Sequence, residues 1–412
     1  MAVSKLEKIE GGVTAAQGFQ AAHTGAGIKY SGRDDMAMIY SELPCRSAGT
    51  YTRNVVKAAP VEFDRMRTEN TADLHAVVIN AGIANACTGA QGLKACQETA
   101  DQAAKLLNIK SNAVLVASTG VIGMQLPMDK VLAGVSAMVP KLAPGLSAGH
   151  DAAKAIMTTD THPKECAVTF EIQGKKCTIG GMTKGSGMIH PNMGTMLCFL
   201  TTDCEIEKWA LMEALKTCVN DTFNMVSVDG DTSTNDTCVL LANGAAENPL
   251  ITMGTDDYQT FVDALHFVTK DLAKQIAGDG EGASHLFIAQ VLHAGNDADA
   301  RTLAKAVITS NLTKAAIFGK DANWGRILCA LGYSGVYFRP ENVDLYFESA
   351  NGKIKLVENG VALNYSEEEA TRILSAEEVT AICDMKSGES CAEAYGCDLT
   401  YDYVKINADY RS

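Results

Sequence analysis

The chain has 412 residues, of which 47% are hydrophobic and 20% charged, and a formal net charge of −14 from 35 basic and 49 acidic side chains. This length allows two or three domains or one large α/β unit, and the composition is that of a globular protein. The negative charge argues against nucleic acid or an anionic membrane as a partner. A local basic pocket can still bind an acidic small molecule.

Cysteine and histidine spacing gives no indication of a disulfide framework or a metal site. The 13 cysteines are spread from Cys45 to Cys397 without a C-x-x-C pair, and the eight histidines form no H-x-x-x-H pair. The first residues, "MAVSKLEKIEGG", lack the apolar core of a signal peptide, and no apolar run is long enough to cross a bilayer. We therefore expect a cytoplasmic protein without a metal, whose cysteines are mostly buried thiols.

The first half of the chain is predicted to be rich in strands. Short apolar runs that end in glycine predict strands at 75–82 and 113–120. Polar and apolar residues alternate over 166–182 around Gln173-Gly174, which predicts a β-hairpin with its turn there. A helix is expected to begin with Asp203 as its cap, because apolar residues then recur at helical spacing as far as Val219.

The second half mixes strands with helices. Strands are predicted at 237–244, 285–295 and 335–348. A helix over 257–276 is expected to stop at Gly278. Two capping boxes predict two further helix starts: Ser366 with Glu369, and Ser375 with Glu378. Hairpins and crossovers together indicate a mixed α/β layered architecture, without the regular alternation of a dinucleotide-binding fold.

The segment "KGSGMIHPNMGTML" places Gly194-Thr195 directly before an apolar run. A threonine hydroxyl needs a neighbouring base to act as a nucleophile, and the α-amine of an N-terminal threonine can be that base. Thr195 gains such an amine only if the bond after Gly194 is cut through an N-to-O acyl shift, which a small preceding residue favours. The same pair also fits an ordinary turn entering a strand, so the pattern alone leaves both interpretations open.

Three other glycine-rich segments carry candidate side chains. In "VASTGVIG" a strand ends at Thr119-Gly120, where a hydroxyl and a backbone N–H could stabilise the oxyanion of acyl transfer. Lys184 in "GGMTKGSG" lacks the Walker spacing and could instead pair with a substrate carboxylate. Glu281 in "GDGEGASH" could bind a substrate ammonium or transfer a proton. Each of these segments also fits a plain turn or loop.

The segment "SVDGDTSTNDT" is dense in acidic, amide and hydroxyl side chains. It differs from a calcium-binding loop because Gly230 comes too early and the closing glutamate is missing. We expect a turn that supports a site rather than a set of metal ligands.

Together these segments resemble one family, the ornithine acetyltransferases, also called glutamate N-acetyltransferases, of arginine biosynthesis. The resemblance covers the whole chain through seven motifs in order: "ASTGVIG", "MTTDTHPK", "KGSGMIHPNMGTML", "VDGDTSTNDT", "GDGEGA", "GKDANWGRI" and "NADYRS". It implies a mixed α/β fold of the layered α-β-β-α type, made as a self-cleaving precursor. It also implies ping-pong transfer of acetyl from N2-acetyl-L-ornithine to L-glutamate, which gives L-ornithine and N-acetyl-L-glutamate.

The resemblance further implies roles for particular residues. Cleavage between Gly194 and Thr195 would give an α chain, 1–194, and a β chain, 195–412, which assemble as a heterotetramer of two α and two β chains. Thr195 is the implied nucleophile, and Thr119 with Gly120 the oxyanion hole. The implied substrate-binding residues are Thr158, Lys184, Thr195, Glu281, Asn407 and Ser412. The family more often has alanine before the nucleophile and commonly ends in threonine; glycine is equally small, and serine keeps the hydroxyl.

No metal, redox or nucleotide cofactor is expected, and the expected partners are small-molecule substrates and the chain's own two halves. Some family members also take acetyl from acetyl-CoA, and the sequence does not show whether this chain does. Two alternatives stay open. One is an N-terminal-nucleophile amidase or aminopeptidase with water as the acceptor, and the other is a glycine-rich nucleotide-binding or regulatory protein without covalent chemistry.

Overall fold

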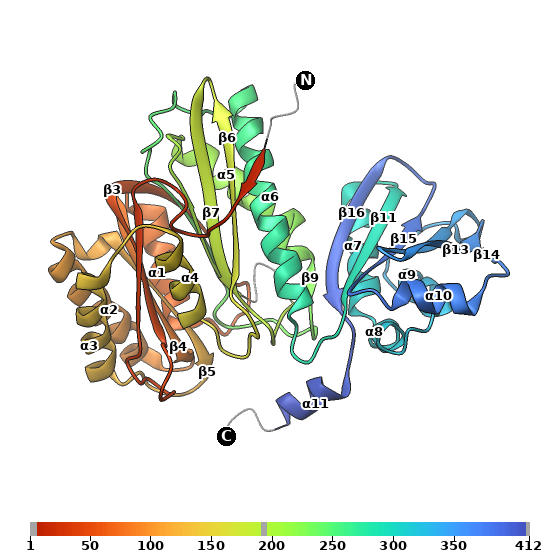
Figure 1. Cartoon of the computed structure of the whole chain (residues 1–412), viewed down its shortest axis with the longest axis horizontal. Helices are drawn as coiled ribbons and strands as arrows, with labels where there is room; N and C mark the ends of the chain where they lie inside the picture. Colours follow the sequence, from red (N-terminus) through yellow and green to blue (C-terminus); the bar gives the residue numbers. More distant parts are fainter. Residues whose placement is uncertain (1–5, 191–195, 409–412) are drawn as a thin grey trace. The chain divides into compact units, whose positions relative to one another are not determined.

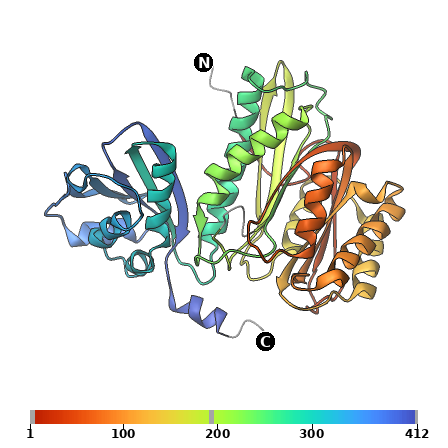
Figure 2. The ribbon, with the colours of Figure 1, turned by 180° about the vertical axis from the view of Figure 1, so that it is seen from behind.

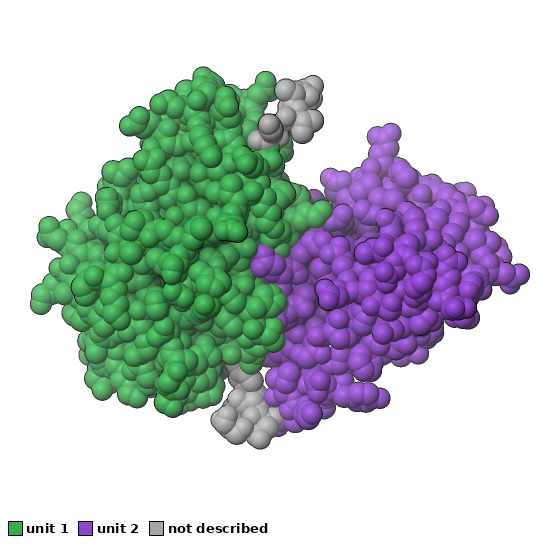
Figure 3. All heavy atoms as spheres, in the orientation of Figure 1, with its two compact units in different colours: residues 1–185, 191–223, 232–272 green, residues 186–190, 224–231, 273–412 purple. Residues whose placement is uncertain are grey.

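The computed structural model describes residues 6–190 and 196–408, which fold into two compact units (Figure 3). Unit 1 comprises 1–185, 191–223 and 232–272, and unit 2 comprises 186–190, 224–231 and 273–412. Each unit has its own β-sheet with helices packed against it (Figure 1), so the expected mixed α/β class is confirmed. Among the described residues, no helix is long and apolar enough to span a membrane.

Unit 1 is built on a nine-stranded sheet in the order β1-β6-β7-β8-β10-β3-β4-β5, with β2 also paired to β3. The strands are β1 (Glu7–Ile9), β2 (Phe19–Thr24), β3 (Met36–Tyr51), β4 (Leu74–Ile83), β5 (Val114–Val121), β6 (Lys164–Ile172), β7 (Lys175–Lys184), β8 (Leu197–Thr202) and β10 (Thr237–Ala242). The pairs β4–β5 and β8–β10 are parallel, and the other neighbours are antiparallel.

Helices cover both faces of this sheet, because its central strands are apolar on both sides (Figures 1 and 2). Ile39 and Val77 pack on the face that carries α4, whereas Met38 and Val78 pack on the face that carries α2 and α3. The helices are α1 (Ala59–Asn70), α2 (Gly89–Leu107), α3 (Met128–Met138), α4 (Leu146–Ala155), α5 (Lys208–Asp221) and α6 (Asp256–Gly278), of which the part from 273 on belongs to unit 2, with the 3₁₀ helices η1 (Ser111–Ala113) and η2 (Val139–Lys141).

Unit 2 is built on a seven-stranded sheet in the order β14-β13-β12-β15-β11-β16-β9. The strands are β9 (Val226–Ser227), β11 (Leu286–Ala294), β12 (Asp344–Ser349), β13 (Gly352–Glu358), β14 (Val361–Ala362), β15 (Glu378–Asp384) and β16 (Ser390–Cys397). The α-helices are α7 (Asp297–Thr309), α8 (Asn311–Phe318), α9 (Trp324–Gly332), α10 (Glu367–Leu374) and α11 (Tyr401–Asn407). α7 packs on β11 and β16, and α10 on β12 and β13.

Several predicted elements are confirmed. β4, β5, β10 and β11 lie where apolar runs predicted strands, and β6 and β7 form the predicted hairpin. Its turn residues Gln173 and Gly174 have φ of 46° and 81°. A two-residue hairpin turn of type I′ requires positive φ at both of these positions. α6 ends at Gly278, and the Ser366 side chain caps α10 by accepting from the Glu369 N–H.

The predicted helix start at Asp203 is wrong. α5 begins at Lys208, after Glu207. The Asp203 carboxylate instead accepts the backbone N–H groups of Thr178 at 2.7 Å and Gln17 at 3.1 Å. Tertiary contacts therefore use the oxygens that a helix cap would have used.

Two predictions near the C-terminus are also wrong. Of the expected strand 335–348 only 344–348 forms a strand, as part of β12, because Pro340 begins the 3₁₀ helix η4 (Pro340–Asn342) and has no N–H to donate to a ladder. Ser375 does not start a helix. It lies just after the end of α10 and donates its hydroxyl to the Arg372 carbonyl at 2.7 Å, and Glu378 begins the strand β15.

Candidate active site

The first group of predicted site residues surrounds Lys184, the buried last residue of β7 in unit 1. Its Nζ donates to the Thr158 hydroxyl at 2.8 Å and to the Thr119 hydroxyl at 3.4 Å. We call these three residues, together with Asp160 and Lys164, the Lys184 cluster. Three residues that lie far apart in the sequence, and that the family resemblance had implied, are therefore in direct contact.

Asp160 organises this cluster. Its Oδ1 accepts from Lys164 Nζ and from the Gly185 N–H, both at 2.7 Å, while its Oδ2 accepts from the Thr158 N–H at 3.0 Å and lies 3.8 Å from Lys184 Nζ. Burial alone would raise the pKa of Asp160, but Lys184 and Lys164 together lower it far below its ordinary value of 3.8. The carboxylate is therefore ionised and fixes both lysines and the Thr158 backbone.

Thr119 and Gly120 lie at the end of β5, where the sheet requires a glycine. Gly120 pairs with Gly82 of the parallel strand β4 and has a φ of +128°. A Cβ at position 120 would lie 2.2 Å from the Gly82 carbonyl carbon. The two strand ends therefore approach each other so closely that only glycine fits, beside a half-buried Thr119.

Asn235 supports the same strand end from the segment predicted to be a supporting turn. Its side-chain amide donates to the Ser118 carbonyl at 2.7 Å and to the Ala84 carbonyl at 2.6 Å. Both carbonyls flank the β4–β5 ends, so Asn235 holds the residue before Thr119 in place.

Gly194 and Thr195, the expected cleavage site and nucleophile, lie outside the described residues. The strands on either side of them, β7 and β8, pair antiparallel within unit 1, with Lys184 opposite Leu197. The Thr183 hydroxyl also donates to the Leu197 carbonyl at 2.9 Å. Leu197 follows Thr195 by two residues and begins a strand that is buried along its whole length.

The second group lies in unit 2 around Glu281, and we call Glu281, Asn407, Ser186 and Gly187 the Glu281 corner. Glu281 Oε2 accepts from the Asn407 side-chain amide at 2.7 Å, and the Glu281 N–H donates to the Ser186 carbonyl at 3.0 Å. A Cβ at Gly187 would lie 2.3 Å from the Glu281 carboxylate, so glycine makes room for it. Ser412, the other residue expected here, lies outside the described residues.

The short helix α11 carries Asn407 and is fixed at its start. Thr400 caps the helix by accepting from the Tyr403 N–H, and its hydroxyl donates to the Gly282 carbonyl at 2.7 Å. The Tyr403 hydroxyl donates to Asp229 Oδ2 at 3.4 Å. Burial, with the nearby charges of Asp229 and Glu281, raises the pKa of Tyr403 above its ordinary range, so the phenol keeps its proton.

Sequence reasoning did not assign roles to Asp160, Lys164 or Asn235. Asp160 and Lys164 both occur in the quoted motif "MTTDTHPK", four residues apart, which is the spacing of ordinary exposed ion pairs. Their side chains are nevertheless fully buried, with 0% exposed. The available signal was a lysine two residues before the predicted hairpin, where a buried charge would need a partner.

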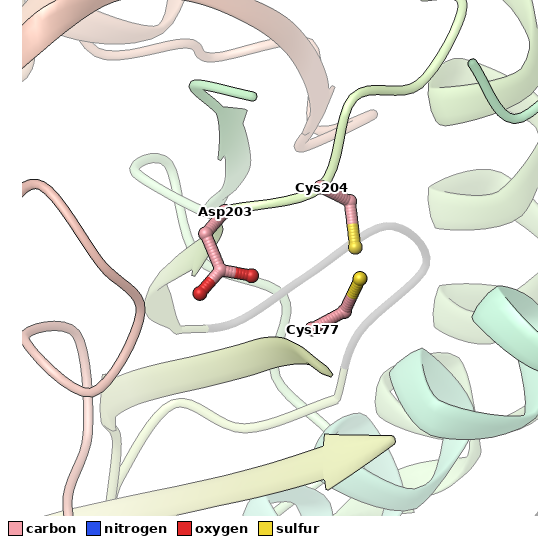
Figure 4. A group of neighbouring side chains, drawn as sticks. All are labelled: Cys177, Asp203 and Cys204. Atoms are coloured by element: carbon pink, nitrogen blue, oxygen red, sulfur yellow. The ribbon is translucent and has the colours of Figure 1, made fainter. Parts of the chain in front are cut away.

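A third polar group in unit 1 consists of Cys177, Asp203 and Cys204 (Figure 4). Their sulfur and oxygen atoms lie within 4.8 Å of one another, and the two sulfurs point toward each other. Burial raises the pKa of the Cys204 thiol well above its ordinary value, and the Asp203 oxygens already accept backbone N–H groups. Because metals bind thiolates, this donor set does not favour an ion. The absence of a metal stays a prediction.

Comparison with known proteins identifies the family. The profile of the ArgJ family matches residues 20–412. The arginine biosynthesis bifunctional protein ArgJ of Symbiobacterium thermophilum is 53% identical over 409 residues, which cover 99% of this chain and all of that protein. The protein of the same name from Caldanaerobacter subterraneus subsp. tengcongensis is 50% identical over 407 residues, with the same coverage.

Two solved structures are also similar. The bifunctional protein argJ of Bacillus halodurans is 46% identical, with a TM-score of 0.49, over 51% of this chain and 97% of that one. The ornithine acetyltransferase of Mycobacterium tuberculosis, solved with ornithine, is 42% identical, with a TM-score of 0.43, over 47% of this chain and 100% of that one. From the family profile and the relatives that match along their whole length, the chain belongs to the ArgJ family.

Proposed function

We propose that this ArgJ-family enzyme transfers the acetyl group of N2-acetyl-L-ornithine to L-glutamate, giving L-ornithine and N-acetyl-L-glutamate. Family membership and the name of the relatives, which places them in arginine biosynthesis and calls them bifunctional, support this proposal. The structural observation that carries it is the Lys184 cluster. There the buried Lys184 ammonium contacts the hydroxyls of Thr119 and Thr158. Lys184 itself pairs across the sheet with Leu197, two residues after Thr195.

The proposed precursor is cut by its own threonine. The Thr195 hydroxyl attacks the Gly194 carbonyl carbon, and the peptide C–N bond breaks as the Thr195 nitrogen takes a proton. Water then hydrolyses the ester, which leaves residues 1–194 with a new carboxylate and residues 195–412 with a free α-amine. That amine is the base that the hydroxyl lacked in the precursor.

Acetyl transfer then proceeds in two half-reactions. Thr195 Oγ attacks the acetyl carbonyl carbon while the α-amine takes its proton, and the Thr119 hydroxyl and the Gly120 N–H stabilise the oxyanion. The C–N bond to ornithine breaks as the ornithine nitrogen takes the proton. The amine of glutamate next attacks the acetyl ester, Thr195 Oγ recovers a proton, and N-acetylglutamate leaves.

Charge complementarity supports the assignment of the binding residues. Both substrates carry an α-carboxylate, which suits the Lys184 ammonium beside Thr158. The side-chain ammonium of ornithine suits the carboxylate of Glu281, which Asn407 orients from α11. Ser412 belongs to the same proposed set of substrate-binding residues.

The remaining implications of the family resemblance are part of the same proposal. They are the α-β-β-α layering, the assembly of two α and two β chains, the cytoplasmic location and the absence of a metal, redox or nucleotide cofactor. Acetyl-CoA is proposed as a second acetyl donor for glutamate.

Intact mass measured after a brief pulse of N2-acetylornithine tests the proposal. We expect two fragments, 1–194 and 195–412, with one added acetyl group on the second fragment and its loss when glutamate is added. Thr195→Ala should remain one full-length chain and take up no acetyl group. The control Thr302→Ala changes an exposed threonine of α7 and should behave as the unaltered protein does.

Three results would contradict the proposal. A Thr195→Ala chain that still splits would remove the nucleophile assignment. Release of ornithine at a rate that ignores glutamate would indicate a hydrolase with water as the acceptor. A single intact chain that never becomes acetylated would indicate a protein without covalent chemistry.

A further inference from the structure

Unit 1 contains a basic hollow that none of the assigned residues uses. Thr24 at the end of β2 and residues of the following loop, as far as Asp34, line an open hollow of about 810 Å³ together with Lys130 of α3 and Lys141 of η2. This volume lies within the range of small-molecule sites. Four cations face the hollow, namely Lys29, Arg33, Lys130 and Lys141, against the single carboxylate of Asp34. Its sign is therefore opposite to that of the whole chain, which carries −14.

The charges of these four cations are not neutralised by carboxylates. Lys130 Nζ donates to the Gly27 carbonyl at 2.7 Å, and the Arg33 guanidinium lies 4.7 Å from the centre of the Tyr30 ring. Within the described part of the chain, none of the four forms an ion pair, and Lys141 also has no hydrogen bond. The Asp34 carboxylate lies 2.6 Å from the His23 ring instead. A convergent, unpaired positive charge of this kind favours anion binding.

The loop is held in shape by a buried carboxylate. Asp35 is fully buried, and its oxygens accept the N–H groups of Ala26 at 2.7 Å and Ile28 at 2.6 Å. The Asp35 N–H also donates to the Thr24 carbonyl, which closes the two ends of the loop on each other. The cations of the loop are therefore presented by a fixed backbone, which lowers the entropic cost of ordering them around a ligand.

The hollow adjoins the proposed acetyl-transfer residues through two contacts within unit 1. A Cβ at Gly82, the strand partner of Gly120, would lie 2.9 Å from Lys29 Cβ and 3.3 Å from the Tyr30 ring. On the other side, the Arg33 guanidinium donates to the carbonyl of Met157, the residue before Thr158.

We propose that the basic hollow binds the phosphate groups of a coenzyme-A-type acyl donor. This inference rests on the proposed function, because it assigns a place to the second acetyl donor. Lysine and arginine side chains are the protein groups that bind phosphate, with arginine offering paired N–H donors and lysine a point charge. A polyanion is the ligand class that gains most from four cations with no carboxylate partner.

Calorimetric titration with coenzyme A tests this site without any turnover. Coenzyme A should bind, and pantetheine, which lacks the phosphates, should bind at least tenfold more weakly. Added salt should weaken the binding of coenzyme A but not that of pantetheine. The double variant Lys29→Gln/Lys141→Gln removes two of the four cations and should raise the dissociation constant for coenzyme A about tenfold or more. A tenfold change corresponds to about 1.4 kcal/mol. The exposed Lys105→Gln on α2 is the matched control and should leave it unchanged.

Specific outcomes overturn the inference. Coenzyme A that does not bind, or that binds the double variant as tightly as the unaltered protein, removes the site. Inorganic phosphate or ATP that binds as tightly as coenzyme A shows a general phosphate site and removes the acyl-donor assignment. A thermal midpoint matched between the double variant and the control excludes misfolding as the cause. Failure of this titration leaves exchange between acetylornithine and glutamate untouched, so it is distinct from failure of the proposed function.

Discussion

The Lys184 cluster of unit 1 and the Glu281 corner of unit 2 hold their side chains by different physical means. Lys184 ends an interior strand, and the fully buried side chains of Asp160 and Lys164 surround it with charge. Glu281 lies in a loop, where a glycine leaves it room and an exposed residue of a short helix, Asn407, donates one hydrogen bond. Damage to the first should therefore cost stability as well as activity, and damage to the second mainly activity.

Asp160→Asn breaks the first arrangement and should have the largest effect. It leaves Lys164 and Lys184 buried without the carboxylate between them, which typically costs about 3–5 kcal/mol. Urea unfolding measures this loss. The control Glu171→Gln, at an exposed position of β6, should change the free energy of unfolding by less than about 0.5 kcal/mol. A loss below about 1 kcal/mol for Asp160→Asn would mean that the cluster is not held by its buried charges.

Gly187→Ala disturbs the second arrangement and should act on activity. The added Cβ would meet the Glu281 carboxylate at 2.3 Å, so that carboxylate must shift from the position in which it accepts from Asn407. We expect kcat/KM for acetylornithine to fall about 10- to 100-fold, a loss of about 1.4–2.7 kcal/mol of transition-state stabilisation. The unfolding free energy should fall by less than in Asp160→Asn.

Gly332→Ala is the matched control for this change, because a Cβ there meets no atom within 4 Å. It should leave kcat/KM unchanged. Full activity in Gly187→Ala would show that the position of the Glu281 carboxylate does not matter for transfer.

The smallest expected effect is on the pH dependence of unfolding, which should differ between the two units. In unit 2, burial lowers the pKa of His190 to about 4, and the charge of Lys305 adds to this. Since the unfolded chain then binds the proton first, stability should fall as pH drops from about 6.5 to about 4. In unit 1, the lowered pKa of Asp160 preserves its contribution until pH falls below 3.8.

His190→Gln should therefore flatten the fall of the melting temperature between pH 6.5 and 4, by about 2–4 °C. His162→Gln changes an exposed histidine and should keep the slope of the unaltered protein. Equal slopes for His190→Gln and the unaltered protein would show that His190 does not carry this proton linkage.

The sequence predicts elements well where local chemistry decides the structure. The Gln173-Gly174 turn and the Ser366 cap need only their own neighbours, and both form as expected. The predicted helix start at Asp203 was wrong because the Asp203 oxygens accept the N–H groups of Gln17 and Thr178, which no local sequence pattern reveals. The prediction of a strand over 335–348 was wrong around Pro340, which begins a 3₁₀ helix. The missing N–H of this proline already argued against a continuous strand in the sequence.

The candidate site shows the same division. Thr119, Thr158 and Lys184 came from motif resemblance, and the structure brings them into contact. Asp160 and Lys164 were not assigned, because a spacing of four residues does not distinguish an exposed ion pair from a buried one. Burial is a property of the assembled sheet, and only the structure supplies it.

The placement of β9 has a consequence for how the chain is synthesised. β9 belongs to the sheet of unit 2, yet its neighbours in the sequence on both sides belong to unit 1, and its partner is Tyr395-Gly396 of β16. At ribosomal rates of roughly 5–20 residues per second, Val226 emerges about 10–30 s before its partner exists. Unit 1 can thus complete its sheet during translation, whereas the segment 224–231 stays without its strand partner until the C-terminal part of the chain has been synthesised.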